Sequence, residues 1–165
     1  MQEKLHKLML AMIAYNSGDA KRIQHFIKVH ALAKLIGEEE KLDAKTLYIL
    51  EAAALTHDIG IRNSEKKYGT CTGKQQEVEG PPEAEKLLQS LGFGADVTER
   101  VCWLIAHHHT YNNIEGNDYQ ILVEADFLVN FYEDNLGKNI IETTLQKIFQ
   151  TESGKTLCRL CYFGH

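Results

Sequence analysis

Proline is scarce in this chain of 165 residues, with only two, adjacent to each other at positions 81 and 82. Because proline interrupts helices, most of the sequence is free to be helical. Long apolar runs are also missing, and none approaches the roughly 18 residues of a membrane span. The amphipathic N-terminus lacks the uninterrupted apolar stretch and cleavage site of a signal peptide. We therefore expect a cytoplasmic protein that does not associate with membranes.

Cysteine and net charge set further limits. Four scattered cysteines suit a reduced protein better than a disulfide framework. The formal net charge of −5 argues against a general nucleic-acid-binding surface. Apolar residues make up 44% and charged residues 25%, as in an ordinary soluble protein, which argues against a disordered or fibrous chain. The composition leaves the oligomeric state open.

The alternating apolar pattern of strands is also missing, and apolar residues recur instead at helical spacing. This pattern predicts an all-α fold, a compact bundle of several helices in a single domain over residues 1–165. We expect helices over 83–91, after the two prolines, and over 97–107, with a capping box from Asp96 to Glu99. A further helix should start at Asn117 or Asp118, and the last helical stretch near Lys138. The polar segment 62–80 shows no period and is predicted to be a long loop.

Histidine, in contrast, is abundant, with eight residues. His57 and Asp58 end a very apolar helix, and His25 and Asp126 each interrupt the apolar face of another. Taken singly, each fits a buried polar group satisfied by hydrogen bonds, and the run 107–109 fits a surface cluster. Together they place imidazoles and carboxylates on facing helices, which is how helical bundles hold catalytic metals. The sequence therefore predicts a metal site between helices.

The motifs H25-FIKV-HALA, LTH57D58IG and LVEAD126FL occur in the order typical of the HD-domain superfamily of metal-dependent phosphohydrolases, which the chain resembles. The resemblance covers roughly residues 20–132, which leaves a C-terminal helical extension over 138–165. It implies a small stand-alone member in which His25, His57, Asp58 and Asp126 hold a divalent metal ion. Fe, Mn, Co, Ni and Zn all suit such ligands.

The resemblance also implies a second metal ion in many members. Here Glu79, before Gly80-Pro81, stands where a histidine is often found, and His108 follows a helix in the second expected position. Asp58 would bridge the two ions. Whether one or two ions bind, and whether His107 or His109 also reaches the site, stays open. As a helix-terminal acid, Glu79 has a simpler interpretation that needs no metal.

A phosphohydrolase needs cations that hold its substrate, which would be a small phosphorylated molecule, in many such members a nucleotide. We expect Arg62, Lys66, Lys67 and Lys74 in this role, since they lie in the segment after His57 and Asp58, the expected catalytic pair. A solvated loop is the simpler interpretation of these four. Two other functions stay open: a diiron oxygenase of the same fold, and a binding or sensory domain without catalysis.

Overall fold

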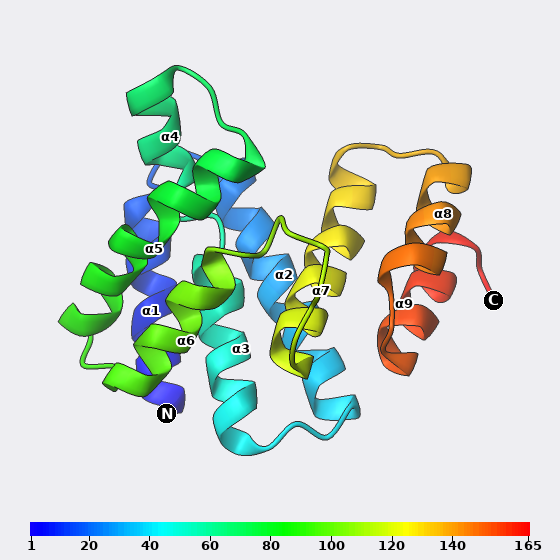
Figure 1. Ribbon diagram of the computed structural model, residues 1–165, viewed down its shortest axis with the longest axis horizontal. Coiled ribbons are helices and arrows are strands. Elements are labelled where there is room, and N and C mark those ends of the chain that lie inside the picture. The colour runs from blue at the N-terminus through cyan, green and yellow to red at the C-terminus, as the bar shows by residue number, and fades with distance from the viewer.

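The computed structural model describes all residues from 1 to 165, and it confirms the all-α prediction. Its nine helices, shown in Figure 1, have the following bounds: α1 Gln2–Tyr15, α2 Ala20–Glu39, α3 Ala44–Thr56, α4 Ile61–Tyr68, α5 Gly73–Ser90, α6 Ala95–Ile105, α7 Asn117–Glu133, α8 Lys138–Ile148 and α9 Glu152–Tyr162. None of the nine helices has the length and apolar character that a membrane span requires. All four cysteines are free.

Helix α3 is the centre of the bundle. Nine of its residues are buried, and it packs against α1, α2, α6 and α7. The long helices α2 and α7 lie against each other beside it, and α5 pairs with α6 (Figure 1). The α8–α9 pair covers the far end of α7 (Figure 1). Because α3 is enclosed by these helices, His57 at its C-terminal end is fully buried, and Asp58 next to it is partly buried.

The segment predicted as a loop over 62–80 is helical, so that prediction is wrong. It contains all but one residue of α4 and the first part of α5. Helix α4 buries only Ser64, which leaves no apolar period to detect. Helix α5 begins at Gly73, where Thr72 and Gln75 form a capping box, and it runs through both prolines instead of starting after them.

The backbone of α5 at Gly80 lies very close to the backbone of the turn after α3 at Gly60. A Cβ atom at Gly60 would lie 2.6 Å from the backbone nitrogen of Gly80, and one at Gly80 would lie 2.6 Å from Cγ2 of Ile105. Glycine at both positions lets the turn after Asp58 touch the middle of α5. This contact sets the first turns of α5 beside the end of α3.

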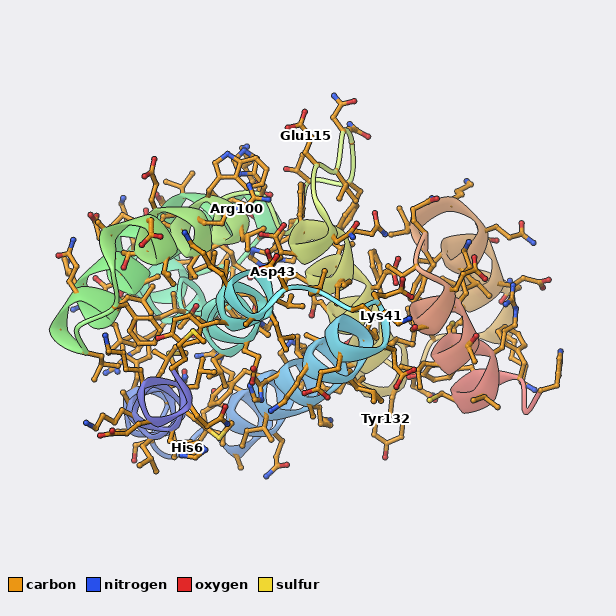
Figure 2. All side chains as sticks on the ribbon, turned by 90° about the horizontal axis from the view of Figure 1, so that it is seen from below. His6, Lys41, Asp43, Arg100, Glu115 and Tyr132 are labelled. Carbon is orange, nitrogen blue, oxygen red and sulfur yellow. The ribbon has the colours of Figure 1, made fainter.

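Other helix boundaries differ less from the predictions. Helix α6 begins at Ala95 after Gly94, which has no side chain to cap it, and the predicted capping box is absent because Asp96 lies inside the helix, where it pairs with Lys45. Helix α7 begins at Asn117 and extends to Glu133, and α8 begins at Lys138 as predicted. Side chains at the periphery point into solvent, among them His6 on α1 and Tyr132 near the end of α7 (Figure 2).

Candidate metal centre

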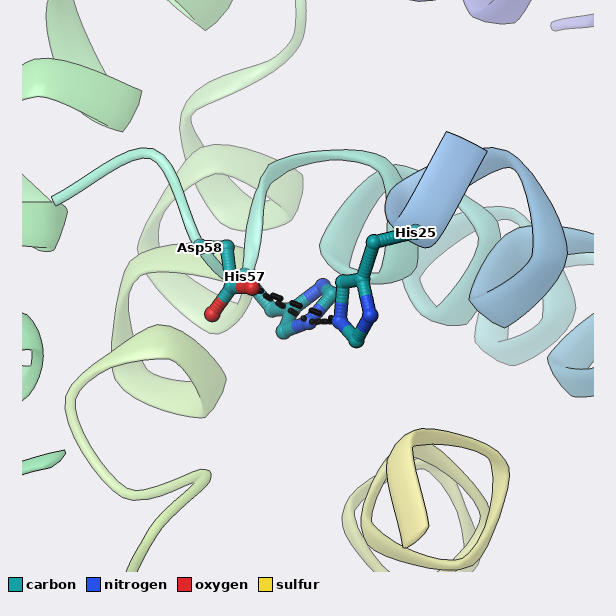
Figure 3. Close-up of side chains that lie close together, drawn as sticks. All are labelled: His25, His57 and Asp58. Carbon is teal, nitrogen blue, oxygen red and sulfur yellow. Dashed lines mark hydrogen bonds and ion pairs between the residues drawn. The ribbon is translucent and has the colours of Figure 1, made fainter. Parts of the chain in front are cut away.

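Four polar side chains from two helices and one turn converge beside the end of α3. They are His25 of α2, His57 and Asp58 after α3, and Asp126 of α7. His57 is fully buried, and His25 and Asp126 are each 7% exposed. Figure 3 shows the rings of His25 and His57 and the carboxylate of Asp58 directed at one another. The helix packing therefore brings together the four residues that the sequence singled out.

The distances between their donor atoms are short. Nε2 of His25 lies 3.2 Å from Nε2 of His57, 3.3 Å from Oδ2 of Asp58 and 3.2 Å from Oδ1 of Asp126. Nε2 of His57 lies 3.5 Å from each of the same two oxygens. Two donors that share one ion at about 2.0–2.2 Å lie at most about 4.4 Å apart. The separations therefore fit donors of a single ion.

The histidine tautomers also suit metal binding. Nδ1 of His57 donates to the carbonyl of Ala54 at 2.9 Å, and Nδ1 of His108 to the carbonyl of Ile105 at 2.7 Å. Nδ1 of His25 donates to Oε2 of Glu133 at 2.8 Å. A proton fixed on Nδ1 leaves the lone pair of Nε2 free, which is the usual arrangement of histidine ligands.

Asp58 connects this cluster to a second one. Its other oxygen, Oδ1, lies 3.6 Å from Nε2 of His108, and donors of Asp58, His108 and His109 all lie within 4.8 Å of one another. His108 is 1% exposed, and its Nε2 has no hydrogen-bond partner. A buried polar atom left unpaired costs about 1–3 kcal/mol of folding free energy, so a ligand bound to this nitrogen would stabilise the protein.

Charge interactions inside the cluster shift its acidities. Burial lowers the pKa of His57, but Asp58 and Asp126 outweigh this effect and raise it to about 9. Burial raises the pKa of Asp58, but the neighbouring histidines, His57 first, lower it to about 2. Hydrogen bonds from His25 and His57 hold the pKa of Asp126 well below its usual value in spite of burial. In the metal-free centre, the carboxylates thus pair with protonated imidazole. A divalent cation that binds there would displace the imidazole proton.

Glu79, predicted as a ligand of the second ion, belongs to neither cluster. Its carboxylate accepts hydrogen bonds from Lys67 at 2.7 Å and from the hydroxyl of Tyr68 at 2.8 Å. Gln76 lies one turn earlier on α5, and its Oε1 is 3.0 Å from Nε2 of His109. The geometry therefore points to Gln76 in the place predicted for Glu79, because Lys67 and Tyr68 of α4 hold the carboxylate of Glu79, whereas the amide of Gln76 contacts His109.

The open questions about the histidine run are answered by the same geometry. His109 reaches the site, and burial together with the nearby His108 lowers its pKa to about 4. His107 points away, with its ring stacked on Trp103 at 4.1 Å and its Nδ1 bonded to the Trp103 carbonyl. His30 bonds to Glu51 instead of the site.

The clusters open into a cleft of about 550 Å³. Its lining residues are Asp19, Lys21, Arg22, His25, Asp58, Ile61, Glu65, Cys71, Gln76, His109, Asp126, Asn130, Glu133 and Asp134. Six of these are carboxylates, whereas only two, Lys21 and Arg22, are permanent cations. A cleft with this excess of negative charge attracts metal cations and repels anions unless metal is bound.

The cations predicted to contact substrate do not line this cleft. Arg62 donates to the carbonyl of Tyr15 at 2.9 Å and lies over its ring, and Lys67 pairs with Glu79. Lys74 pairs with Glu77 at 3.5 Å, and Lys66 is exposed on α4. The cations of the cleft, Lys21 and Arg22, lie on α2, where Arg22 is one turn before His25. Helical spacing places Arg22 on the same face as His25, which was the available signal for a role that was not predicted.

Comparisons with known proteins found one family model and one solved structure that match most of the chain. The family model described as "HD domain" matches residues 22–148, which include all four members of the first cluster. The chain is similar to the crystal structure of a predicted HD superfamily hydrolase from an uncultured Thermotogales bacterium, with a TM-score of 0.65 and 26% sequence identity. That alignment covers 99% of this chain and 85% of the other. No curated protein matches the sequence.

Proposed function

Because the chain belongs to the HD domain family, we propose that it is a metal-dependent phosphohydrolase. Its substrate is a small phosphate ester or anhydride, with nucleotides as the leading class. One observation carries this proposal: Asp58 directs Oδ2 at His25 and His57 and Oδ1 at His108. A carboxylate shared by two groups of metal donors is suited to a hydrolytic centre of one or two ions.

When bound, a divalent ion lowers the pKa of a coordinated water toward neutrality and offsets charge on phosphoryl oxygens. The protein's part is to hold the ion and to direct the substrate. His25, His57, Asp58 and Asp126 would form the first set of ligands, and the Nδ1 protons of His25 and His57, held by Glu133 and by the carbonyl of Ala54, fix the direction of both imidazoles. Fe, Mn, Co, Ni or Zn fits this mixed nitrogen and oxygen set.

A second set consists of Asp58, His108 and His109. With a pKa of about 4, His109 is neutral at pH 7 and keeps a lone pair for an ion. The amide oxygen of Gln76 is a weaker ligand than an imidazole or a carboxylate. We therefore propose that the second ion binds less tightly than the first.

Substrate phosphate would approach from the side of Lys21 and Arg22. Arg22 is held in place by ion pairs with Asp19 at 3.3 Å and with Glu65, and Lys21 is exposed at the edge of the cleft. A guanidinium fixed by carboxylates keeps further N–H groups for a phosphate oxygen. The two cations, together with bound metal, would offset the carboxylates of the cleft.

The proposal is tested on purified protein by elemental analysis followed by a phosphate-release screen. We expect at least one divalent ion per chain and metal-dependent release of phosphate from members of a panel of nucleotides and simple phosphate esters. Arg22→Ala should raise KM more than it lowers kcat, and Lys66→Ala, outside the cleft, should leave both unchanged. Protein that holds metal and consumes oxygen with an organic substrate, without releasing phosphate, would identify an oxygenase and contradict the proposal.

A further inference from the structure

One face of α7 carries three polar residues. They are Asp126, Asn130 and Glu133, spaced by four and three residues, so that they line up on the side facing the cleft. Asn130 donates to Oδ1 of Asp126 at 3.0 Å. Tyr132, next to Glu133, is 74% exposed and points outward (Figure 2). Glu133 therefore points toward the cleft because of its angle around the helix, whereas the adjacent Tyr132 points into solvent.

His25 of α2 contacts this face through both of its ring nitrogens. Its Nε2 lies 3.2 Å from Oδ1 of Asp126, and its Nδ1 lies 2.8 Å from Oε2 of Glu133. The Glu133 side chain is only 12% exposed. Its second oxygen, Oε1, accepts from Lys28, one turn after His25 on α2, at 2.6 Å. Both oxygens of Glu133 are thus bonded to the same face of α2.

The anchor of His25 differs in kind from those of the other two histidines. His57 and His108 donate their Nδ1 protons to neutral backbone carbonyls, whereas His25 donates to a carboxylate. Hydrogen bonds to an ionised acceptor are roughly twice as strong as neutral ones. A carboxylate on Nδ1 also increases electron density at Nε2, the nitrogen that faces the cluster.

We propose that Glu133 is a positioning residue of the metal centre: through Nδ1 of His25 it orients that imidazole and strengthens Nε2 as a ligand of the first ion. This inference rests on the metal site of the proposed function, but not on the reaction or the substrate. The competing explanation is structural: Glu133 would only pair with Lys28 and hold the end of α7 against α2.

Variants of Glu133 separate the two explanations. Glu133→Gln keeps an oxygen that accepts from Nδ1 and removes the negative charge, whereas Glu133→Ala removes both. Asp134→Asn is the matched control, because it removes one carboxylate from the same cleft at the adjacent position without a contact to His25. Metal affinity is measured by competition with a chromophoric chelator, using Mn or Zn alone, and folding is checked by thermal unfolding of the metal-free proteins.

We expect Glu133→Gln to weaken binding of the first ion about tenfold and Glu133→Ala up to about 100-fold, the range for lost outer-shell partners. Asp134→Asn should change affinity by no more than about threefold, since an exposed charge is screened. In NMR spectra, the downfield Nδ1 proton signal of His25 should move upfield in Glu133→Gln, a change that a merely structural role does not produce.

Equal metal affinities in wild type, Glu133→Gln and Asp134→Asn, with an unmoved Nδ1 signal, would overturn the inference and leave the proposed function intact. Equal losses in Glu133→Gln and Asp134→Asn would also overturn it, because they would reflect the general charge of the cleft. Wild-type protein that binds neither ion would overturn both. If metal binds and only phosphate release is absent, the proposed function fails while the affinity differences still decide the role of Glu133.

Discussion

Lowering the pH should weaken metal binding to the centre in a defined way. The charges of Asp58 and Asp126 raise the pKa of His57 to about 9 in the metal-free protein. His57 therefore carries a proton on Nε2 at pH 7, and a metal ion must displace it, since only neutral imidazole is a ligand. We expect metal binding at pH 7 to release at least one proton per ion.

The magnitude follows from the pKa of His57. Below a pKa of about 9, each pH unit lowers the apparent affinity about tenfold, or by about 1.4 kcal/mol. Between pH 8 and pH 6 the affinity should thus fall about 100-fold. The pKa of His25 is also raised, since its bonds to Asp126 and the charge of Asp58 outweigh burial, and its proton makes the fall steeper at the acidic end.

The same shift affects the free energy of unfolding of the metal-free protein. Because the pKa of His57 is higher in the folded chain than in the unfolded one, its contribution is fully present below about pH 6.5 and is lost as the pH rises through about 9. Metal-free protein should lose this part of its stability between pH 6.5 and 9, whereas metal-loaded protein, whose His57 is already neutral, should not.

Isothermal titration calorimetry in buffers of different ionisation enthalpy measures the released protons directly. His6→Ala is the control, since His6 is an exposed residue of α1 outside the cleft (Figure 2). In the metal-free protein, Asp58→Asn should lower the pKa of His57, because it removes the largest charge that raises this pKa. An affinity that is independent of pH between 6 and 8, with no protons released, would refute this account of the centre.

Three further outcomes are expected. Asp58→Ala should lose metal, measured by elemental analysis, and phosphate release together, because its carboxylate faces both clusters; unchanged metal content and turnover would show that the site lies elsewhere. Glu79→Gln should keep its metal content, since Glu79 bonds to side chains outside the centre, whereas His108→Ala should lose any second ion, and the same analysis compares the two. Gly154→Ala should lower the free energy of unfolding in urea by about 1–3 kcal/mol, because a Cβ there would clash with Oε2 of the buried Glu124; an unchanged midpoint would contradict the packing of α9 on α7.

The sequence was informative where the signal is local. Helical periodicity and the lack of strand alternation were enough to predict the fold class, since both depend on residues within a turn or two. The residues His57, Asp58, His25 and Asp126 stood out because each interrupts an apolar helix face, and burying a polar group calls for a partner. That these four meet in space could only be expected from their number and from the family resemblance.

The sequence was misleading where local signals compete. Two adjacent prolines suggested the start of a helix at 83, but α5 runs through them from Gly73, held by its capping box and by the contact between Gly60 and Gly80. Glu79 was predicted from its place before Gly80-Pro81 in the family resemblance, and without a helix over 73–80 nothing indicated that Gln76 would reach His109.

The sequence by itself thus determined the helical character of this protein and the chemical nature of its centre. Only the tertiary structure decided which residues surround that centre: Gln76 instead of Glu79, Arg22 instead of Arg62, and Glu133 behind His25. The physical reason lies in the range of the interactions. Periodicity fixes the angle of a side chain around its own helix, whereas the contact of His25 with Glu133, which lies 108 positions later, depends on how α2 and α7 pack.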